Sequence, residues 1–215
     1  MRRVGVALLS AIVTGLLLVP SGASALTTMV VQDSVGDVGI ALDMKTGTIR
    51  DTLSPNAPLV KAGYFDMVSA WLSQKGKTYT FGMELAVALP KEGTPLPNMV
   101  KLAQWDLWID QAPYIVDPAP PVGMIALRYD GSSYSAFVLD WATMVETPIP
   151  FSIDGAKLQL QFTAAQISNA VISWWVPLVE IYVGPLGTTA SAFVDAVDLG
   201  AVTGQVGFDL PWPPA

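Results

Sequence analysis

The chain has 215 residues, a formal net charge of −7 and a hydrophobic content of 52%, and it contains no histidine and no cysteine. These missing side chains exclude Ser-His-Asp and Cys-His catalysis, ordinary zinc and copper sites, haem ligation by histidine and thiol redox chemistry. They also exclude disulfides and a lipid-modified N-terminal cysteine. The acidic balance argues against nucleic-acid binding, which needs a basic patch.

The first 25 residues have the three zones of a secretory signal peptide. Arg2 and Arg3 precede an apolar run over residues 4–19, and Ala23-Ser24-Ala25 provides a cleavage motif. The apolar run is short for a membrane anchor, which needs about 20 apolar residues. We therefore expect cleavage before Leu26, a secreted or cell-surface location and no later transmembrane segment. Loss of the two arginines would change the net charge from −7 to −9.

Residues 26–215 are predicted to form one domain made mainly of strands. Residues 63–75 and 77–87 are rich in aromatic and β-branched side chains around Gly76, which predicts a hairpin. Regular alternation in the first run would place Phe65 and Met67 on one face and Ala70 and Leu72 on the other. The proline-rich residues 90–98 and 113–121 should be loops, because proline cannot donate to a strand ladder.

The second half of the chain continues this pattern. Strands are expected at residues 103–110, 122–129, 133–141, 151–153, 157–162 and 174–183. Asp130-Gly131 and Asp154-Gly155 predict hairpin turns, Thr163 begins a capping box that predicts a short helix, and Pro177 predicts an edge or a bulge. The pattern fits an antiparallel sandwich or barrel. We favour an all-β, jelly-roll-like two-sheet sandwich with one short helix near residues 164–170.

Five motifs also occur in a characteristic order. They are Asp33-x-x-x-Asp37, Tyr64-Phe-Asp-Met-Val68, Trp105-Asp-Leu-Trp-Ile-Asp110, Leu127-Arg-Tyr-Asp-Gly131 and Val194-Asp-Ala-Val-Asp-Leu-Gly200. In this order the chain resembles the DOMON-like and family-9 carbohydrate-binding-module superfamily of secreted β-sandwiches, over nearly all of residues 26–215. The resemblance implies a jelly-roll-like fold that binds a ligand, commonly sugar and sometimes haem, often with structural calcium. Haem is disfavoured here, because haem-binding members use histidine or methionine pairs and this chain has no histidine.

Five acidic residues are candidate ligands of a structural calcium ion: Asp33, Asp37, Asp66, Asp195 and Asp198. Calcium takes six to eight oxygen ligands. Residues 33–37 do not begin an EF-hand loop, because Val35 and Val38 occupy the positions of a ligand and a glycine. A site would need the two ends of the domain to lie side by side. The alternative is a turn in which these acids accept backbone hydrogen bonds.

Seven residues are candidates for ligand binding: Trp105, Trp108, Trp141, Trp174, Trp175, Asp106 and Asp110. Flat aromatic rings suit the apolar faces of sugars, and carboxylates can bind their hydroxyl groups. Because side chains alternate along a strand, Trp105 and Trp108 should point to opposite faces, and so should Trp174 and Trp175. The alternative for each tryptophan is core packing.

The sequence therefore predicts a secreted or cell-surface, non-enzymatic binding module for carbohydrate or a small ligand, with calcium as a candidate structural ion and no zinc or haem. A structural or adhesive surface protein and a carrier of apolar ligands are open alternatives, since both suit the high hydrophobic content. A glycosidase would need two paired acids. The available acids, which the sequence does not mark as paired, are Asp106, Asp110, Glu84, Asp140 and Glu146.

Overall fold

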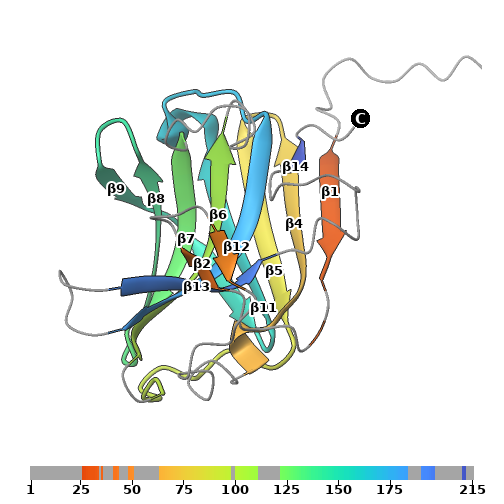
Figure 1. Ribbon diagram of the computed structural model, residues 1–215. Helices are drawn as coiled ribbons and strands as arrows, with labels where there is room; N and C mark the ends of the chain where they lie inside the picture. Colours follow the sequence, from red (N-terminus) through yellow and green to blue (C-terminus); the bar gives the residue numbers. More distant parts are fainter. Residues whose placement is uncertain are drawn as a thin grey trace, which may run out of the picture.

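The computed structural model describes residues 26–33, 35, 41–43, 48–50, 63–97, 100–110, 122–183, 190–196 and 210–211. These residues form an all-β fold with two main antiparallel sheets and very little helix (Figure 1). The predicted two-sheet sandwich is confirmed. The predicted signal peptide and the proline-rich residues 113–121 lie outside the described residues.

The first sheet has five strands. In spatial order they are β1 (Thr27–Gln32), β4 (Met67–Lys75), β5 (Thr78–Leu85), β11 (Lys157–Thr163) and β10 (Phe151–Asp154). Strand β11 has the predicted alternation: Leu158, Leu160 and Phe162 are buried, whereas Gln159 and Gln161 are exposed. One face of this sheet is therefore apolar and packs into the core, and the other faces solvent.

The second sheet has seven strands. In spatial order six of them are β13 (Ala190–Ala196), β12 (Trp174–Val183), β6 (Val100–Asp110), β7 (Gly123–Tyr129), β8 (Tyr134–Asp140) and β9 (Val145–Pro148), and β14 (Leu210–Pro211) also pairs with β12. A small two-stranded sheet, β2 (Ala41–Asp43) and β3 (Thr48–Arg50), contacts β13 through β2 (Figure 1).

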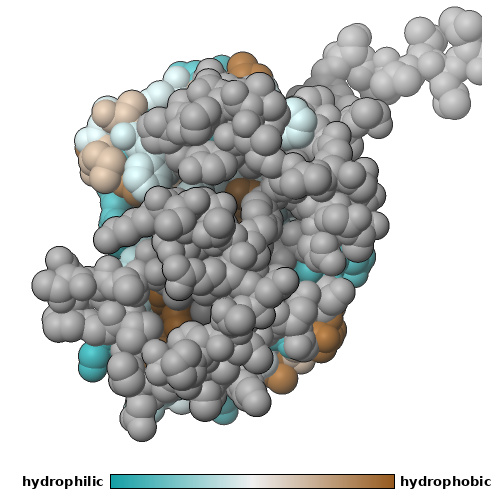
Figure 2. Space-filling view, in the orientation of Figure 1, coloured by the Kyte–Doolittle hydropathy of each residue, from teal (hydrophilic) through white to brown (hydrophobic). Residues whose placement is uncertain are grey.

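The main core lies between the two large sheets and is built by alternate positions of their strands. Trp105, Leu107 and Ile109 of β6 and Phe81 and Met83 of β5 all belong to this layer. In the space-filling view, described hydrophilic residues appear along the rim, and some hydrophobic residues reach the surface in the centre and near the lower edge (Figure 2).

The three predicted hairpins are present. Strands β4 and β5 pair across Gly76, β7 and β8 pair across Asp130-Gly131, and β10 and β11 pair across Asp154-Gly155. The Asp130 carboxylate accepts hydrogen bonds from the backbone N–H groups of Ser132 and Ser133 at 2.8 and 2.9 Å, which fixes that turn.

The prediction for residues 63–75 was wrong in two details. Residues Gly63–Phe65 form a 3₁₀ helix, η2, and strand β4 begins only at Met67. A register shift between Met67 and Ser69 then places Met67 in the same core as Ala70 and Leu72, although regular alternation separates them. The short helix predicted after Thr163 is confirmed as the 3₁₀ helix η3 (Ala164–Ile167), where Thr163 N–H donates to Gln166 Oε1 at 2.8 Å.

The prediction that Pro177 marks an edge or a bulge holds only locally: β12 is an interior strand, but no described strand pairs with Pro177 on the side away from β6. Strand β12 is interior and pairs with β6 along its length, including Pro177 opposite Leu107. On its other side β12 pairs with β14 through Trp174 and Trp175 and with β13 from Leu178 onward. Among the described residues Pro177 thus falls between two partners on that side of β12, a position that suits a residue without a backbone N–H.

Candidate functional site

The side of the seven-stranded sheet that faces away from the main core carries an unusual set of side chains, and we call it the outer face. Alternation assigns to it every second residue of β6, β7, β8 and β12, because the residues between them belong to the core. Its polar members include Gln104, Asp106, Arg128 and Glu180, and its apolar members include Met124, Ala126, Phe137 and Leu139.

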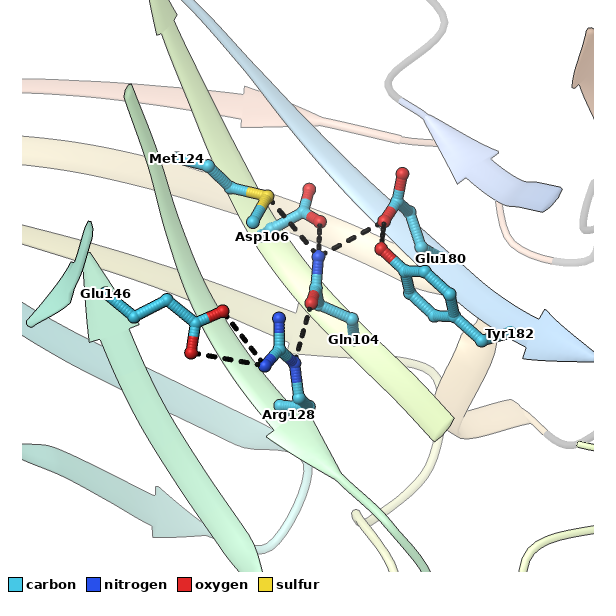
Figure 3. Close-up of polar contacts among 7 residues, drawn as sticks. All are labelled: Gln104, Asp106, Met124, Arg128, Glu146, Glu180 and Tyr182. Atoms are coloured by element: carbon cyan, nitrogen blue, oxygen red, sulfur yellow. Dashed lines mark hydrogen bonds and ion pairs between the residues drawn. The ribbon is translucent and has the colours of Figure 1, made fainter. Parts of the chain in front are cut away.

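The amide of Gln104 is the centre of a hydrogen-bond network on this face (Figure 3). Its Nε2 donates to Asp106 Oδ2 at 2.7 Å and to Glu180 Oε2 at 3.1 Å, and it lies 3.4 Å from Met124 Sδ. The hydroxyl of Tyr182 donates to the same Glu180 oxygen at 2.8 Å. One amide nitrogen therefore holds two carboxylates, which come from neighbouring strands β6 and β12.

Arg128 closes the other side of this network. Its Nε donates to Gln104 Oε1 at 3.2 Å, which fixes the orientation of the amide. Its guanidinium lies 4.1 Å from the centre of the Phe137 ring and forms an ion pair with Glu146 at 3.2 Å. Arg128 thus links the buried amide to an exposed acid on edge strand β9.

The two acids of the network are removed from solvent. Gln104 and Asp106 have no exposed surface, and Glu180 is 4% exposed. Burial raises the pKa of Glu180 to about 7, against the lowering effects of the Tyr182 hydrogen bond and the Arg128 charge. Burial first, and then the charge of Glu180, raise the pKa of Asp106 well above its ordinary value. Both shifts follow mainly from removing the carboxyl groups from water, and the neighbouring acid adds to the shift of Asp106.

Half-buried tryptophans gather at the end of the outer face beyond Asp106. Trp108 and Trp141 pack edge to face, with their ring centroids 6.1 Å apart, against the apolar cluster of Met124, Phe137 and Leu139. Trp174 stands on the same face of β12 and is the ladder partner of Asp110. We call Trp108, Trp141, Trp174 and Asp110 the aromatic end; all four are half-buried.

Four of the seven predicted ligand-binding residues are therefore brought together. The expected splits are also confirmed, because Trp105 and Trp175 lie in the main core on the opposite side of the sheet from Trp108 and Trp174. Trp105 is fully buried, and its indole N–H donates to the carbonyl of Tyr64 at 2.8 Å. The seventh residue, Asp106, belongs to the buried network rather than to the aromatic end.

The predicted calcium ligands are only partly described. Asp33 follows β1 and donates its backbone N–H to Val68 O at 2.9 Å, and Asp66 precedes β4, so both lie at one end of the five-stranded sheet. Asp195 lies on β13 of the other sheet, opposite Val179. Asp37 and Asp198 lie outside the described residues. In the part of the chain that the structure describes, no group of three or more acidic side chains could hold one metal ion. The calcium site stays a prediction.

Sequence reasoning did not identify Gln104, Arg128, Glu180 or Tyr182 as a group. A signal was present, since Gln104 and Asp106 occupy alternate positions in the apolar middle of their strand and Glu180 is the one acid in residues 174–183. Such polar residues inside apolar strands indicate partners on a neighbouring strand, because an unpartnered buried polar group is costly.

Comparison with known proteins gave no relative for this chain: no family model, curated protein or solved structure matches it. Among the described residues, no helix has the length and apolar character of a membrane span.

Proposed function

We propose that the chain is a secreted or cell-surface, non-enzymatic module that binds carbohydrate at the aromatic end of its outer face. The observation that carries this proposal is the gathering of three half-buried tryptophans and a half-buried carboxylate at one end of a rigid sheet. Aromatic rings of this kind offer apolar area with little loss of side-chain entropy. Asp110 adds an acceptor for hydroxyl groups beside them.

The motif order that resembles DOMON-like and family-9 carbohydrate-binding modules supports the same function. The position of the aromatic end on regular strands also favours binding. Trp108 lies on the strand that carries Asp106, and Trp141 follows strand β8 directly. Binding groups that are held by regular strands lose little freedom when a ligand arrives.

The acid pair supports binding rather than glycoside hydrolysis. Nε2 of Gln104 contacts both carboxylates, so Asp106 Oδ2 and Glu180 Oε2 are no more than 5.8 Å apart, the sum of 2.7 and 3.1 Å. Glycosidases place their two acids at comparable separations, with the scissile bond between them. Here the amide nitrogen takes that place, and the carboxylates bind a neighbouring side chain instead of a substrate.

Structural calcium at the predicted ligands remains part of this proposal. Asp33 and Asp66 at the end of the five-stranded sheet would supply two of its carboxylates. Asp37, Asp195 and Asp198 would supply the others, as the resemblance implies.

The test is a glycan-array screen followed by titration calorimetry of the strongest glycan. Replacing Trp108 or Trp141 by alanine should weaken binding by roughly tenfold or more, as for other central aromatic contacts. Trp71→Ala is the matched control, because Trp71 is also a half-buried strand tryptophan but lies in the five-stranded sheet. No glycan binding by the wild-type chain, or an equal loss in Trp71→Ala, would contradict the proposal.

A further inference from the structure

Asp106 joins the buried network of the outer face to the aromatic end. Alternate positions of β6 carry Gln104, Asp106, Trp108 and Asp110, so these four side chains share the outer face. Gln104 Nε2 donates to Asp106 Oδ2 at 2.7 Å. The Asp106 carboxyl group also accepts a hydrogen bond from the Trp108 side chain. Asp106 therefore contacts the network on one side and a ring of the aromatic end on the other.

The neighbours of Asp106 across the sheet are apolar. Its ladder partners are Ala126 of β7 and Leu178 of β12, and both are buried. The indole nitrogen of Trp108 is buried too, although the ring as a whole is half-buried. Because a buried N–H group without an acceptor is costly, the hydrogen bond to Asp106 favours one orientation of the indole.

Trp108 is also held by its apolar surface. It packs edge to face against Trp141, with the ring centroids 6.1 Å apart. Behind Asp106 the polar contacts continue through Gln104 to Arg128, whose Nε donates to Gln104 Oε1 at 3.2 Å (Figure 3). A ring that is fixed both at its N–H and at its apolar edge loses little freedom when a ligand arrives.

We propose that Asp106 is a positioning residue of the carbohydrate site and orients the Trp108 indole by accepting a hydrogen bond from its N–H. This inference rests on the proposed function, because it gives Asp106 a role in binding without contact with the sugar. Asparagine should not replace Asp106, since its amide has one acceptor oxygen and its NH₂ group would face a donor of Gln104 or Trp108. Turning the Gln104 amide round would in turn oppose its NH₂ group to Arg128 Nε.

The first measurement is the ¹H–¹⁵N spectrum of the purified chain without ligand, in which each indole N–H gives its own signal. Trp108→Phe assigns the Trp108 signal by removing it. Asp106→Asn should move the Trp108 signal, because its hydrogen bond is weakened. The Trp71 signal, from the other sheet, should stay in place and is the internal reference. An unmoved Trp108 signal would overturn the inference.

The second measurement is titration calorimetry with the glycan selected by the array screen. Asp106→Asn should weaken its binding by about fivefold, the size expected when one more side chain must be ordered by the ligand. In a Trp108→Phe background, which has no indole N–H, the same substitution should cause no further loss. A further loss of equal size there would overturn the inference, because Asp106 would then act on the site without Trp108.

The wild-type chain provides the test if circular dichroism shows that Asp106→Asn does not fold. Its Trp108 indole N–H should exchange with deuterium roughly tenfold more slowly than that of Trp141, since both nitrogens are buried and Trp108 has Asp106 as an acceptor. Equal or faster exchange at Trp108 would overturn the inference.

The two proposals fail in different ways. Absence of glycan binding by the wild-type chain, with a Trp108 signal that moves in Asp106→Asn, would contradict the proposed function while confirming the contact. An unmoved Trp108 signal in a chain that does bind glycan would contradict the positioning role of Asp106 alone.

Discussion

The two large sheets use their outward sides in opposite ways. On the five-stranded sheet, Gln159 and Gln161 are exposed, and Lys157 forms an ion pair with Glu84 at 3.3 Å in contact with water. On the seven-stranded sheet, Gln104, Asp106 and Glu180 occupy equivalent outward positions but are buried. Polar side chains on the two faces should therefore contribute differently to the free energy of unfolding. A polar group in water needs no protein partner, whereas a buried polar group does.

The largest difference in stability between the two sheets should appear when the Gln104 amide is removed. Gln104→Ala leaves Asp106, Glu180 and the Nε of Arg128 without the partner that joins them. We expect a loss of about 3 kcal/mol in the free energy of unfolding, because several buried polar groups lose their hydrogen bonds at once. Urea denaturation followed by circular dichroism measures it.

Gln161→Ala is the matched control on the five-stranded sheet. Its side chain is exposed, so the change in unfolding free energy should stay within about 0.5 kcal/mol. Equal effects of the two alanine substitutions would mean that the outer face of the seven-stranded sheet is as well solvated as the other.

A second test of the contrast is the dependence of stability on pH in the presence of EDTA. The pKa of Glu180 is raised from 4.5 to about 7, with Asp106, Arg128 and Tyr182 as its charged or titratable neighbours. A raised pKa means that the folded chain holds the proton more tightly than the unfolded chain. The stabilisation is fully present below pH 4.5 and is lost as the pH rises through about 7.

We therefore expect the unfolding free energy to fall by on the order of 2 kcal/mol between about pH 5 and about pH 8. Glu180→Gln removes the titrating group and should flatten much of this dependence. A wild-type profile that is flat or rises over this range would argue against a buried, protonated acid on the outer face.

These contrasts also show what the sequence can and cannot predict. The exposed side of β11 was predictable, because Leu158, Leu160 and Phe162 alternate with two glutamines. Such alternation indicates a strand with one buried face and one face exposed to solvent. Strand β6 is covered on both sides and shows no such pattern. Its opposite placement of Trp105 and Trp108 still follows from the period of a strand.

The network could not be predicted because its partners are distant in the chain. Gln104 and Glu180 are 76 residues apart and meet only because β6 pairs with β12, a neighbour that is not next to it in sequence. Local patterns predict strands and hairpins, but they do not fix which distant strands become neighbours. The bulge after Met67 was unpredictable for a related reason, since it depends on how β4 meets β5.

A third test concerns a tight contact on the exposed side of the five-stranded sheet. Gly82 pairs with Trp71, and a Cβ added at Gly82 would lie 2.1 Å from the indole ring. Gly82→Ala should therefore displace Trp71 and cost about 1 kcal/mol, although alanine normally stabilises a strand relative to glycine. Thr80→Ala, two residues earlier on the same strand, is the control. A stabilised Gly82→Ala variant with unchanged tryptophan fluorescence would contradict the close contact.

The smallest effect should come from the rim of the outer face, where the network reaches water. The Arg128 side chain is 27% exposed and that of Glu146 is 47% exposed, so their ion pair at 3.2 Å is screened by solvent. Glu146→Gln should change the unfolding free energy by less than about 1 kcal/mol, because partly exposed ion pairs contribute little. Arg128 would keep its bond to Gln104 and its contact with Phe137. A loss as large as that of Gln104→Ala would mean that burial continues to edge strand β9, and that the stability of the network depends on this edge instead of on the Gln104 amide.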